Sequence, residues 1–335
     1  MSDPTRLVVR LPNWLGDVVM ALPALAAIRD AYPGAHLALA GPPGVTPIFE
    51  ETTAVRPQQL LAVQKADEAQ TLRTGAFDTA ILLTNSFRTA WTARRAGIGE
   101  RWGYAAGGRR VLLTRAVRRP RGERHQSEYY LDLVRALGLD ASSSTPRIDL
   151  GARTRERARA LLQQHQAAEG QPLVGFAPGA AYGHAKRWPP DQVARVITRL
   201  ARERSARGIL VGAAGDREAG REIESALPSD VGVVNLIGRT DLRLLMGVMQ
   251  ACGAFVSNDS GAMHLAAAVG IPVTALFGPT RERSTAPLGD HDVLLHQVFC
   301  RPCMLRECPI DHRCMKRITV EEVVAAVNRR LDRRA

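Results

Sequence analysis

The feature that most constrains the fold of this chain is a regular alternation of short apolar runs and segments with helical spacing. Five apolar runs follow one another in the second half, at 172–179, 208–215, 233–238, 254–259 and 271–279. Helical segments separate them, at 191–203, 217–227, 242–252 and 262–269. Short buried strands that alternate with helices are typical of parallel sheets with crossover helices. The second half is therefore predicted to be a doubly wound α/β domain.

The first half repeats this pattern. Its apolar runs lie at 6–11, 36–41 and 79–84, and a helix is expected from Asp17 to Tyr32, with Pro12, Asn13 and Gly16 forming the turn before it. The fold class predicted for the whole chain is therefore α/β, with two Rossmann-like domains in tandem.

A change of composition after Leu139 marks the expected domain junction. The stretch DASSSTPRIDL leads into a charged segment with helical spacing, and apolar regions lie on both sides of it. We place the junction within about ten residues of 155, which gives domains over 1–155 and 156–335. Ligands of such folds bind beyond the carboxyl ends of the strands, so we expect a site between the two domains.

Four strand ends of the second half run into glycine or other small residues, at 178–181, 212–216, 258–261 and 278–280. Glycine lets backbone N–H groups approach an anion closely, and the N-terminus of a following helix adds favourable partial charge. This arrangement predicts a site for a nucleotide diphosphate. The motifs GxxxxGK[ST] and GxGxxG are both missing, which argues against a P-loop nucleoside triphosphatase and a standard dinucleotide dehydrogenase.

Charged residues accompany two of these strand ends. Lys186 and Arg187 precede a helix whose start is set by Pro189 and Pro190, and a lysine there would offset charge on a leaving diphosphate. Asp259 and Ser260 have two interpretations: they cap the helix that begins near Ala262, or they contact a ligand. His264 on that helix is, taken alone, typical of a packed residue.

The first domain has one comparable carboxylate. Asp17 follows Gly16 in the stretch NWLGDVVM, at the turn between the first strand and its helix. It fits either a carboxylate that stabilises the helix dipole or a general base at the predicted ligand site.

The charge of the chain indicates an anionic partner. There are 45 Lys and Arg against 33 Asp and Glu, a net charge of +12, and the segment 88–124 contains eleven Arg and only two Glu. Nucleic acid, an anionic membrane surface and a phosphorylated glycolipid all fit such a segment, and a solvated basic face is the alternative. No apolar stretch is long enough to span a membrane and no secretory signal is present, so we expect a cytoplasmic protein.

Six motifs in order along nearly the whole chain resemble the lipopolysaccharide heptosyltransferases, a family of inverting glycosyltransferases with the GT-B fold. They are NWLGDVVMALPAL from 13, NSFRTA from 85, AGIGERWGY from 96, GAAYGHAKRWP from 179, NDSGAMHLAAAVGIP from 258 and FGPT from 277. The GAAYGHAKRWP motif and the Cys-rich tail resemble the branch that adds the second heptose.

The resemblance implies the substrates. The donor is ADP-L-glycero-β-D-manno-heptose and the acceptor is the first heptose of heptosyl-Kdo2-lipid A, met at the inner face of the inner membrane, where the protein would be peripheral. Nucleic acid is not an expected partner.

The resemblance also implies site residues. Asp17 takes the place of the catalytic base. Donor contacts are expected at Gly179, Tyr182, Lys186, Asp216, Asp259, Ser260, Gly261 and His264. Acceptor contacts are expected at Asn13, Arg88, Arg94, Arg95 and Arg101, with the Arg cluster from 109 to 124 behind them. Ala180 and Ala181 stand where relatives can carry hydroxyl or acidic residues, which puts side-chain contacts at these two positions in doubt.

Metal chemistry is not required by the sequence. No Asp-x-Asp pair follows a strand, so we expect no required cofactor, although a loosely bound Mg²⁺ stays open. Four cysteines, Cys300, Cys303, Cys308 and Cys314, fit no common zinc module by their spacing. We interpret them as a packed loop of reduced thiols, with a zinc or iron–sulfur site as the alternative.

Three other functions stay open. Transferases that add the first or a later core heptose share almost every motif. A nucleotide-sugar epimerase of the same fold would need the diphosphate loops, but its paired His and acidic residues cannot be placed here. A nucleic-acid-binding protein would explain the charge and leave the strand-end loops unexplained.

Overall fold

The computed structural model describes residues 3–167 and 170–333, and the chain divides into two compact units, Met1–Asp149 and Leu150–Ala335. We call them unit 1 and unit 2. The division falls six residues before the junction placed at 155. The reason is helix α5 (Ala152–Gln164), which packs against α8 (Leu242–Ala251) and so belongs entirely to unit 2.

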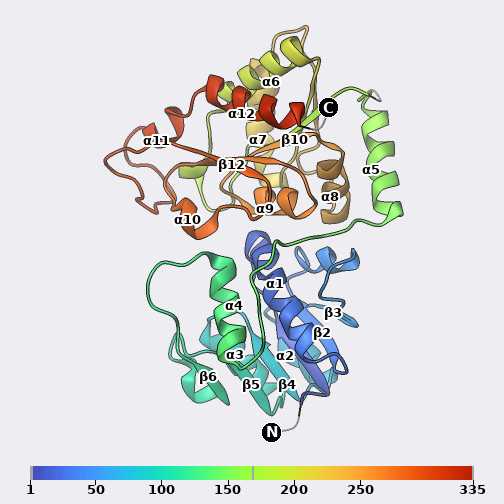
Figure 1. Ribbon diagram of the computed structural model, residues 1–335, viewed down its shortest axis with the longest axis vertical. Helices are drawn as coiled ribbons and strands as arrows, with labels where there is room; N and C mark the ends of the chain where they lie inside the picture. The colour runs from blue at the N-terminus through green and yellow to red at the C-terminus, as the bar shows by residue number, and fades with distance from the viewer. Residues whose placement is uncertain (1–2, 168–169, 334–335) are drawn as a thin grey trace. The chain divides into compact units, whose positions relative to one another are not determined.

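Unit 1 contains a six-stranded parallel sheet in the order β3-β2-β1-β4-β5-β6 (Figure 1). The strands are β1 (Arg6–Arg10), β2 (His36–Gly41), β3 (Gln59–Ala62), β4 (Thr79–Leu82), β5 (Glu100–Tyr104) and β6 (Arg115–Val117). Its helical segments are α1 (Leu15–Ala31), η1 (Thr46–Glu50), α2 (Glu68–Thr74), α3 (Phe87–Arg95), η2 (Arg109–Leu112) and α4 (Gln126–Ala136). Helix α1 packs against α4, whereas α3 packs against α2 and η2.

Unit 2 repeats this topology with its own six-stranded parallel sheet, in the order β12-β11-β10-β7-β8-β9. Counted from its first strand, this is the same order as in unit 1. The strands are β7 (Leu173–Ala177), β8 (Arg207–Leu210), β9 (Val233–Asn235), β10 (Ala254–Asn258), β11 (Val273–Phe277) and β12 (His291–Leu295).

The helices of unit 2 pack together in two groups. Helix α6 contacts α7 and α12, while α8 contacts α5 and α9. Besides α5 and α8, the helical segments are η3 (His184–Lys186), α6 (Pro190–Arg204), η4 (Ala214–Asp216), α7 (Arg217–Ala226), α9 (Gly261–Ala268), α10 (Glu282–Thr285), α11 (Arg313–Lys316) and α12 (Val320–Asp332).

The central strands are covered on both faces, which explains their composition. Leu7, Val8 and Val9 of β1 are buried, as is every residue of β10 and β11. A strand buried on both faces reads as a continuous apolar run and not as an alternation, which is the pattern seen in the sequence.

Each sheet has a topological switch point, where the strand order reverses. It lies between β1 and β4 in unit 1 and between β7 and β10 in unit 2. The loops that leave two such strands diverge to opposite faces of the sheet, and ligands of doubly wound sheets bind in the crevice that results. The loops after β1, β4, β7 and β10 therefore hold the residues to consider first.

The sequence predicted eight of the twelve strands of the described residues within a few residues, among them the edge strand β9. Strands β3, β5, β6 and β12 were not predicted, because three of them are only partly buried and lack a continuous apolar run. Helix α1 begins two residues before the expected start, so Gly16 lies in its first turn and not in the preceding loop. None of the helices in the described part of the chain is long and apolar enough to cross a membrane.

Candidate active site

Asp17 lies at the switch point of unit 1, in the first turn of α1 directly after β1. Its carboxylate oxygen Oδ1 accepts a hydrogen bond of 3.0 Å from the hydroxyl of Tyr130, in the first half of α4. Burial raises the pKa of Asp17 above the ordinary value of a carboxyl group, and the Tyr130 hydrogen bond opposes this rise in part. A half-buried carboxylate that a hydrogen bond holds in one orientation is suited to accept a proton.

Tyr130 was not predicted from the sequence. It stands 113 residues from Asp17, and only the packing of α4 on α1 brings the two together. Burial raises the pKa of the Tyr130 hydroxyl well above its usual value, so this group stays protonated and acts as a donor. No local motif signals such a pair.

The loop after β4 adds a second polar group at this edge of the sheet. Asn85 donates from Nδ2 to the hydroxyl of Tyr129 at 2.8 Å, and its Oδ1 atom is buried with no hydrogen-bond partner among the described residues. Ser86 follows it and caps α3 by accepting from the backbone N–H of Thr89 at 3.3 Å. A buried amide oxygen without a partner among the described residues is a candidate acceptor for a ligand hydroxyl.

Arg109 fills the interior behind this loop. Its guanidinium is fully buried and donates from Nε to the carbonyl of Tyr104 at 2.9 Å. Its terminal nitrogen Nη2 is buried and has no hydrogen-bond partner among the described residues. Burial lowers the pKa of Arg109 to about 10. We assign it to the support of the loop, since no part of it reaches the surface.

The five residues expected at the acceptor are not gathered in one place. Asn13 accepts from Arg10 at 3.0 Å, next to α1. Arg88 is bound to the buried carboxylate of Glu68 at 2.7 Å, and Glu68 also holds Arg10. These contacts are close to the carboxyl end of β1, the edge at which Asp17 lies.

The other three, Arg94, Arg95 and Arg101, lie where the amino ends of the strands are, on the side of the sheet away from Asp17. Helix α3 starts beyond the carboxyl end of β4 and runs back, so that its last residues precede the amino end of β5. The Arg101 guanidinium donates to the carbonyls of Leu112 at 2.7 Å and Gly99 at 2.7 Å, and to that of Ile98. The structure therefore does not bring these three arginines together with Asp17, and it gives Arg101 a backbone-bracing position.

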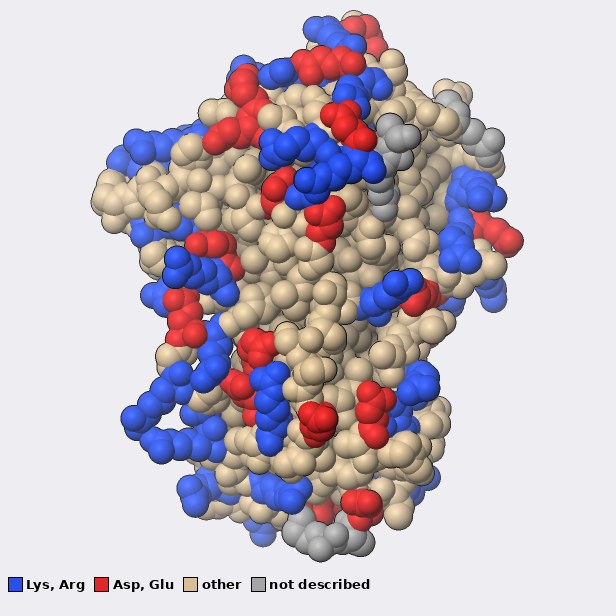
Figure 2. Space-filling view, viewed as in Figure 1, with Lys and Arg blue, Asp and Glu red and all other residues tan. Residues whose placement is uncertain are grey.

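Basic side chains do gather close to Tyr129, in the segment between β6 and α4. Arg118, Arg121 and Arg124 are exposed there, and the Arg119 guanidinium lies 5.5 Å from the centre of the Tyr129 ring. Figure 2 shows Lys and Arg side chains along the edge of unit 1 where Figure 1 places this segment. The sequence had grouped these residues with the other arginines of the segment 88–124, and the fold separates them.

In unit 2 the central feature of the switch point is an ion pair. Lys186, at the end of η3, donates from Nζ to Oδ2 of Asp259 at 2.5 Å, and both side chains are largely buried, with 12% and 6% exposed. Asp259 directly follows β10 and also accepts from the hydroxyl of Thr280 at 2.6 Å. The loops after β7, β10 and β11 thus converge on the carboxylate of Asp259.

The two interpretations of Asp259 and Ser260 are separated by the structure. Ser260 is the N-cap of α9, and its hydroxyl accepts from the backbone N–H of Ala262 at 3.3 Å. Asp259 does not cap the helix, because its carboxylate is turned to Lys186 and Thr280. Gly261 is the first residue of α9, and His264 lies buried in the same helix.

Tyr182 and Asp216 complete the group. The Tyr182 ring lies 4.6 Å from Lys186 Nζ, and its hydroxyl donates to the carbonyl of Met304 at 2.7 Å. Asp216 accepts from the backbone N–H of Ala213 at 3.0 Å and lies 3.5 Å from the Arg187 guanidinium. A cation–π contact and two charged pairs therefore fix the loops after β7, β8 and β10 in one arrangement.

Gly179 is required by close packing. A Cβ atom at this position would lie 2.2 Å from the Asp216 carboxylate, so no larger residue fits while Asp216 keeps its place. The Arg187 Nε atom beside Asp216 is buried and has no hydrogen-bond partner among the described residues. A buried cationic donor left open next to a glycine loop and close to Lys186 is typical of a site for a phosphate group.

The cysteine cluster borders these loops. Cys300, Cys303, Cys308 and Cys314 are free thiols, and burial raises the pKa of Cys314, with the other three close enough to add to the rise. Among residues 3–167 and 170–333, no group of three or more His, Cys, Asp or Glu side chains is placed to hold a metal ion.

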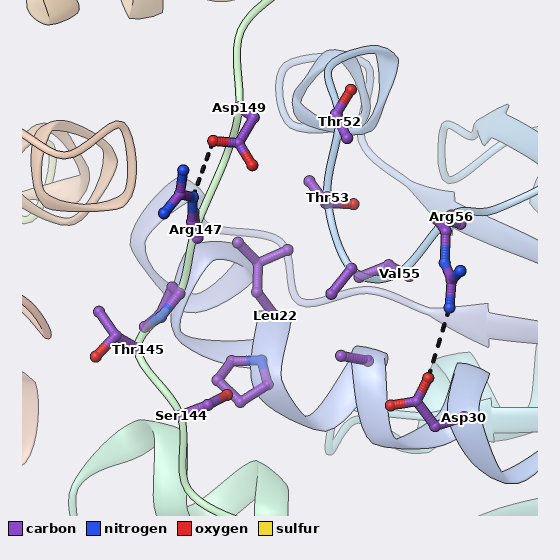
Figure 3. A pocket seen from close by; sticks show the side chains of 14 residues that line it. Leu22, Asp30, Thr52, Thr53, Val55, Arg56, Ser144, Thr145, Arg147 and Asp149 are labelled. Carbon is purple, nitrogen blue, oxygen red and sulfur yellow. Dashed lines mark hydrogen bonds and ion pairs between the residues drawn. The ribbon is translucent and has the colours of Figure 1, made fainter.

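A separate cavity of about 430 Å³ lies in unit 1 beside α1 (Figure 3). Leu22, Pro23 and Ala26 of α1 line it together with the segments 52–56 and 144–149. Ion pairs on its rim join Arg56 to Asp30 at 3.7 Å and Arg147 to Asp149 at 2.9 Å. Asp17 is not among its lining residues, so this cavity is not the candidate active site.

Two doubly wound units of identical strand order, each with charged groups at its switch point, are the architecture of the GT-B fold. Comparison with known proteins gives the family: residues 67–313 match the model of glycosyltransferase family 9 (heptosyltransferase). The chain is 32% identical to lipopolysaccharide heptosyltransferase 2 of Salmonella typhimurium, over 84% of this chain and 85% of the relative. It is 30% identical to lipooligosaccharide heptosyltransferase 2 of Haemophilus influenzae, over 86% and 87%.

A solved structure agrees with these relatives. The structure of ADP-heptose LPS heptosyltransferase II from E. coli matches 98% of this chain and 99% of that one, with a TM-score of 0.85 and 28% identity. The chain therefore belongs to glycosyltransferase family 9, the heptosyltransferases, and is a glycosyltransferase with the GT-B fold. The resemblance and the fold class predicted from the sequence are confirmed.

Proposed function

We propose that this enzyme transfers L-glycero-D-manno-heptose from ADP-L-glycero-β-D-manno-heptose to the first heptose of heptosyl-Kdo2-lipid A, with inversion at the anomeric carbon. The observation that carries the proposal is the half-buried carboxylate of Asp17, with its raised pKa, at the switch point of unit 1. The names of the two heptosyltransferase 2 relatives support the choice of the second heptose.

Asp17 is the general base of this proposal. Its carboxylate takes the proton of the acceptor hydroxyl as the hydroxyl oxygen attacks the anomeric carbon from the face opposite ADP. The bond between the anomeric carbon and the diphosphate oxygen breaks, and ADP leaves with the electron pair. The Tyr130 hydrogen bond keeps the carboxylate in one orientation during the proton transfer.

The leaving ADP is stabilised by unit 2. Lys186 and Arg187 supply two positive charges, and the N-terminus of α9 adds partial positive charge from the loop at Ser260 and Gly261. His264 and Tyr182 are proposed to shape the pocket for the heptose and the diphosphate. In the free enzyme Asp259 balances Lys186, and binding of the donor would let the diphosphate share that lysine.

Metal is not needed in this proposal. The two cations and the helix N-terminus provide the charge that a divalent ion supplies in many other transferases. Transfer is therefore expected to continue in excess EDTA at close to the untreated rate. A complete and Mg²⁺-reversible loss of activity would show that the diphosphate needs a metal.

The acceptor places the enzyme on the inner face of the inner membrane. Kdo carboxylates and lipid A phosphates form a polyanion, which arginine binds through paired hydrogen bonds. We propose that the segment between β6 and α4, together with Asn13 and Arg88, contacts the acceptor near Asp17. Roles for Arg94, Arg95 and Arg101 in acceptor binding stay predictions.

One assay tests the substrates. The purified protein is incubated with ADP-heptose and either Kdo2-lipid A or its monoheptosylated form, and the products are identified by mass spectrometry. Heptose added only to the monoheptosylated form is the expected result. Addition to Kdo2-lipid A instead would identify a transferase for the first heptose, and interconversion of the sugar nucleotide without transfer would identify an epimerase.

A further inference from the structure

Helix α3 has its large and small residues on unexpected sides. Its buried residues are Thr89, Ala90, Thr92 and Ala93, all of them small. Its two aromatic residues, Phe87 and Trp91, are 48% and 46% exposed. An amphipathic helix of a globular domain normally turns its aromatic residues to the core, so this helix keeps apolar area for contact with something outside the unit.

The neighbouring segment extends the same surface. Segment η2 packs beside α3, and Val111 in it is 80% exposed. Phe87 and Trp91 are four positions apart and therefore lie on one side of α3. Among the described residues, eight large hydrophobic side chains are exposed, and three of them belong to these two adjacent elements.

Positive charge surrounds these three side chains. Arg94 and Arg95 are exposed in the last turn of α3, and Arg110 is exposed in η2. We call the set Phe87, Trp91, Val111, Arg94, Arg95 and Arg110 the α3–η2 face.

Negative charge is nearly missing from the same part of the chain. Between 84 and 122 the only acidic residue is Glu100, which accepts hydrogen bonds from Trp102 at 2.9 Å and Thr114 at 2.8 Å. The face is thus cationic and apolar at once.

We propose that the α3–η2 face binds the surface of an anionic phospholipid bilayer. Exposed aromatic side chains partition into the boundary between headgroups and acyl chains, while arginines beside them bind lipid phosphates. The mixture of both kinds of group distinguishes this face from a site for a soluble anion, which would need no exposed Trp or Phe. A lipid surface would also be the anionic partner of Arg94 and Arg95, which lie near the amino ends of the strands and away from Asp17.

This inference deepens the proposed function, because it names the surface by which the enzyme reaches a membrane-embedded acceptor. It rests on that function only for the choice of a membrane as partner. Binding to lipid can be measured without donor or acceptor, so failure of either proposal can be recognised separately.

The test is sedimentation of the full-length protein with vesicles of phosphatidylcholine alone or of phosphatidylcholine and phosphatidylglycerol in equal parts. Wild-type protein is expected to bind only the anionic vesicles. Each basic residue near an anionic surface contributes enough to change affinity about fivefold, so Arg94→Glu with Arg95→Glu should weaken binding at least about tenfold. Trp91→Ser should weaken it several-fold and should also reduce the binding that remains in high salt.

Matched controls come from unit 2. Arg195→Glu with Arg221→Glu reverses two exposed arginines outside the face, and Phe299→Ser removes an aromatic residue that is 79% exposed. Both are expected to bind vesicles as wild type does. Circular dichroism and titration with ADP verify that each variant is folded.

Three results would overturn the proposal. One is equal binding of the α3–η2 variants and the controls. Another is the absence of vesicle binding by the wild type. A third is concentration-dependent self-association that the Trp91→Ser change abolishes while vesicle binding persists, which would identify a second copy of the chain as the occupant.

Discussion

At the scale of single residues, Asp17 combines two properties that act against each other. Burial disfavours its charged form, as the raised pKa shows, yet a general base must be charged to work. A group whose pKa is raised in the folded state contributes stability when it is protonated, and this contribution is lost as the pH rises through that pKa. At neutral pH the charged Asp17 therefore lowers stability in favour of reactivity.

Replacing this carboxylate with an amide separates the two effects. We expect Asp17→Asn to lower kcat by at least about a hundredfold, since general-base catalysis typically contributes about 10²–10⁴. The thermal unfolding midpoint at pH 7 should be equal to that of the wild type or higher, because the amide cannot ionise. Turnover by mass spectrometry, ADP binding by calorimetry and a melting curve are the measurements. Near-normal turnover would leave Asp17 as a helix-terminus carboxylate only.

Tyr130 should control the pH at which Asp17 becomes active. The wild-type profile of kcat/KM is expected to lose activity on the acid side at a pH above the 3.9 of an ordinary Asp, because the folded pKa is raised. Tyr130→Phe removes the donor that opposes this rise, so the acid limb should move to still higher pH. The pH profiles of wild type and variant measure the shift.

Tyr129→Phe is the control for this experiment, because the Tyr129 hydroxyl contacts Asn85. It should leave the position of the acid limb unchanged. If Tyr130→Phe lowers activity equally at every pH, Tyr130 has a packing role and does not tune the base.

At the scale of loops and helices, the conformation of the loop after β7 depends on the carboxylate of Asp216, which packs against Gly179. Gly179→Ala would place a methyl group within 2.2 Å of the Asp216 carboxylate, which must then leave the Ala213 N–H and Arg187. We expect ADP affinity, measured by calorimetry, to fall about tenfold, corresponding to the loss of about 1.4 kcal/mol. Gly215→Ala is the matched control in the neighbouring loop, where nothing lies within 4 Å of the added atom.

This comparison has a clear contrary outcome. If Gly179→Ala keeps its ADP affinity while remaining folded, the Asp216 loop does not take part in donor binding. If Gly215→Ala loses affinity as strongly, the effect belongs to loop stiffness and not to the contact with Asp216.

These same loops show what sequence patterns can and cannot predict. The strand ends at 178–181, 258–261 and 278–280 were predicted from local composition, because small residues and a helix start are local features. Their meeting at one donor site was also expected, but the ion pair between Lys186 and Asp259 was not, since it depends on β7 and β10 being neighbours across the switch point. Order along the chain does not contain that information.

The arginines show the same limit with a different result. Clustering in sequence grouped Arg88, Arg94, Arg95 and Arg101 as one acceptor surface, but a helix of nine residues carries the chain from one edge of the sheet to the other. Arg88 remains near Glu68 at the carboxyl edge, whereas Arg94 and Arg95 lie at the amino edge. A charge run in sequence therefore predicts an anionic partner better than it predicts a single site.

At the scale of the whole molecule, a repeated topology distributes the chemistry. Both units have the same strand order, yet the switch point of unit 1 holds the carboxylate and that of unit 2 holds the paired cation. The sequence predicted two Rossmann-like domains because central strands are buried on both faces and read as apolar runs. The repeated strand order was not predicted, because three of the four edge strands, β3, β6 and β12, carry too little apolar signal to be recognised.

The distribution of charge predicts different salt responses for the two substrates. The Lys186–Asp259 pair is buried and weakly screened, while the arginines between β6 and α4 are exposed. Salt shortens the screening length from about 8 Å at 0.15 M to about 3 Å at 1 M. We therefore expect KM for the polyanionic acceptor to rise at least about fivefold over this range, and KM for ADP-heptose to change less than about twofold.

Initial rates in NaCl series, with one substrate saturating, measure both constants, and a sucrose series of equal osmolality controls for solvent effects. A donor KM that rises as much as the acceptor KM would show that the nucleotide is bound mainly by exposed charge, contrary to the buried site described in unit 2.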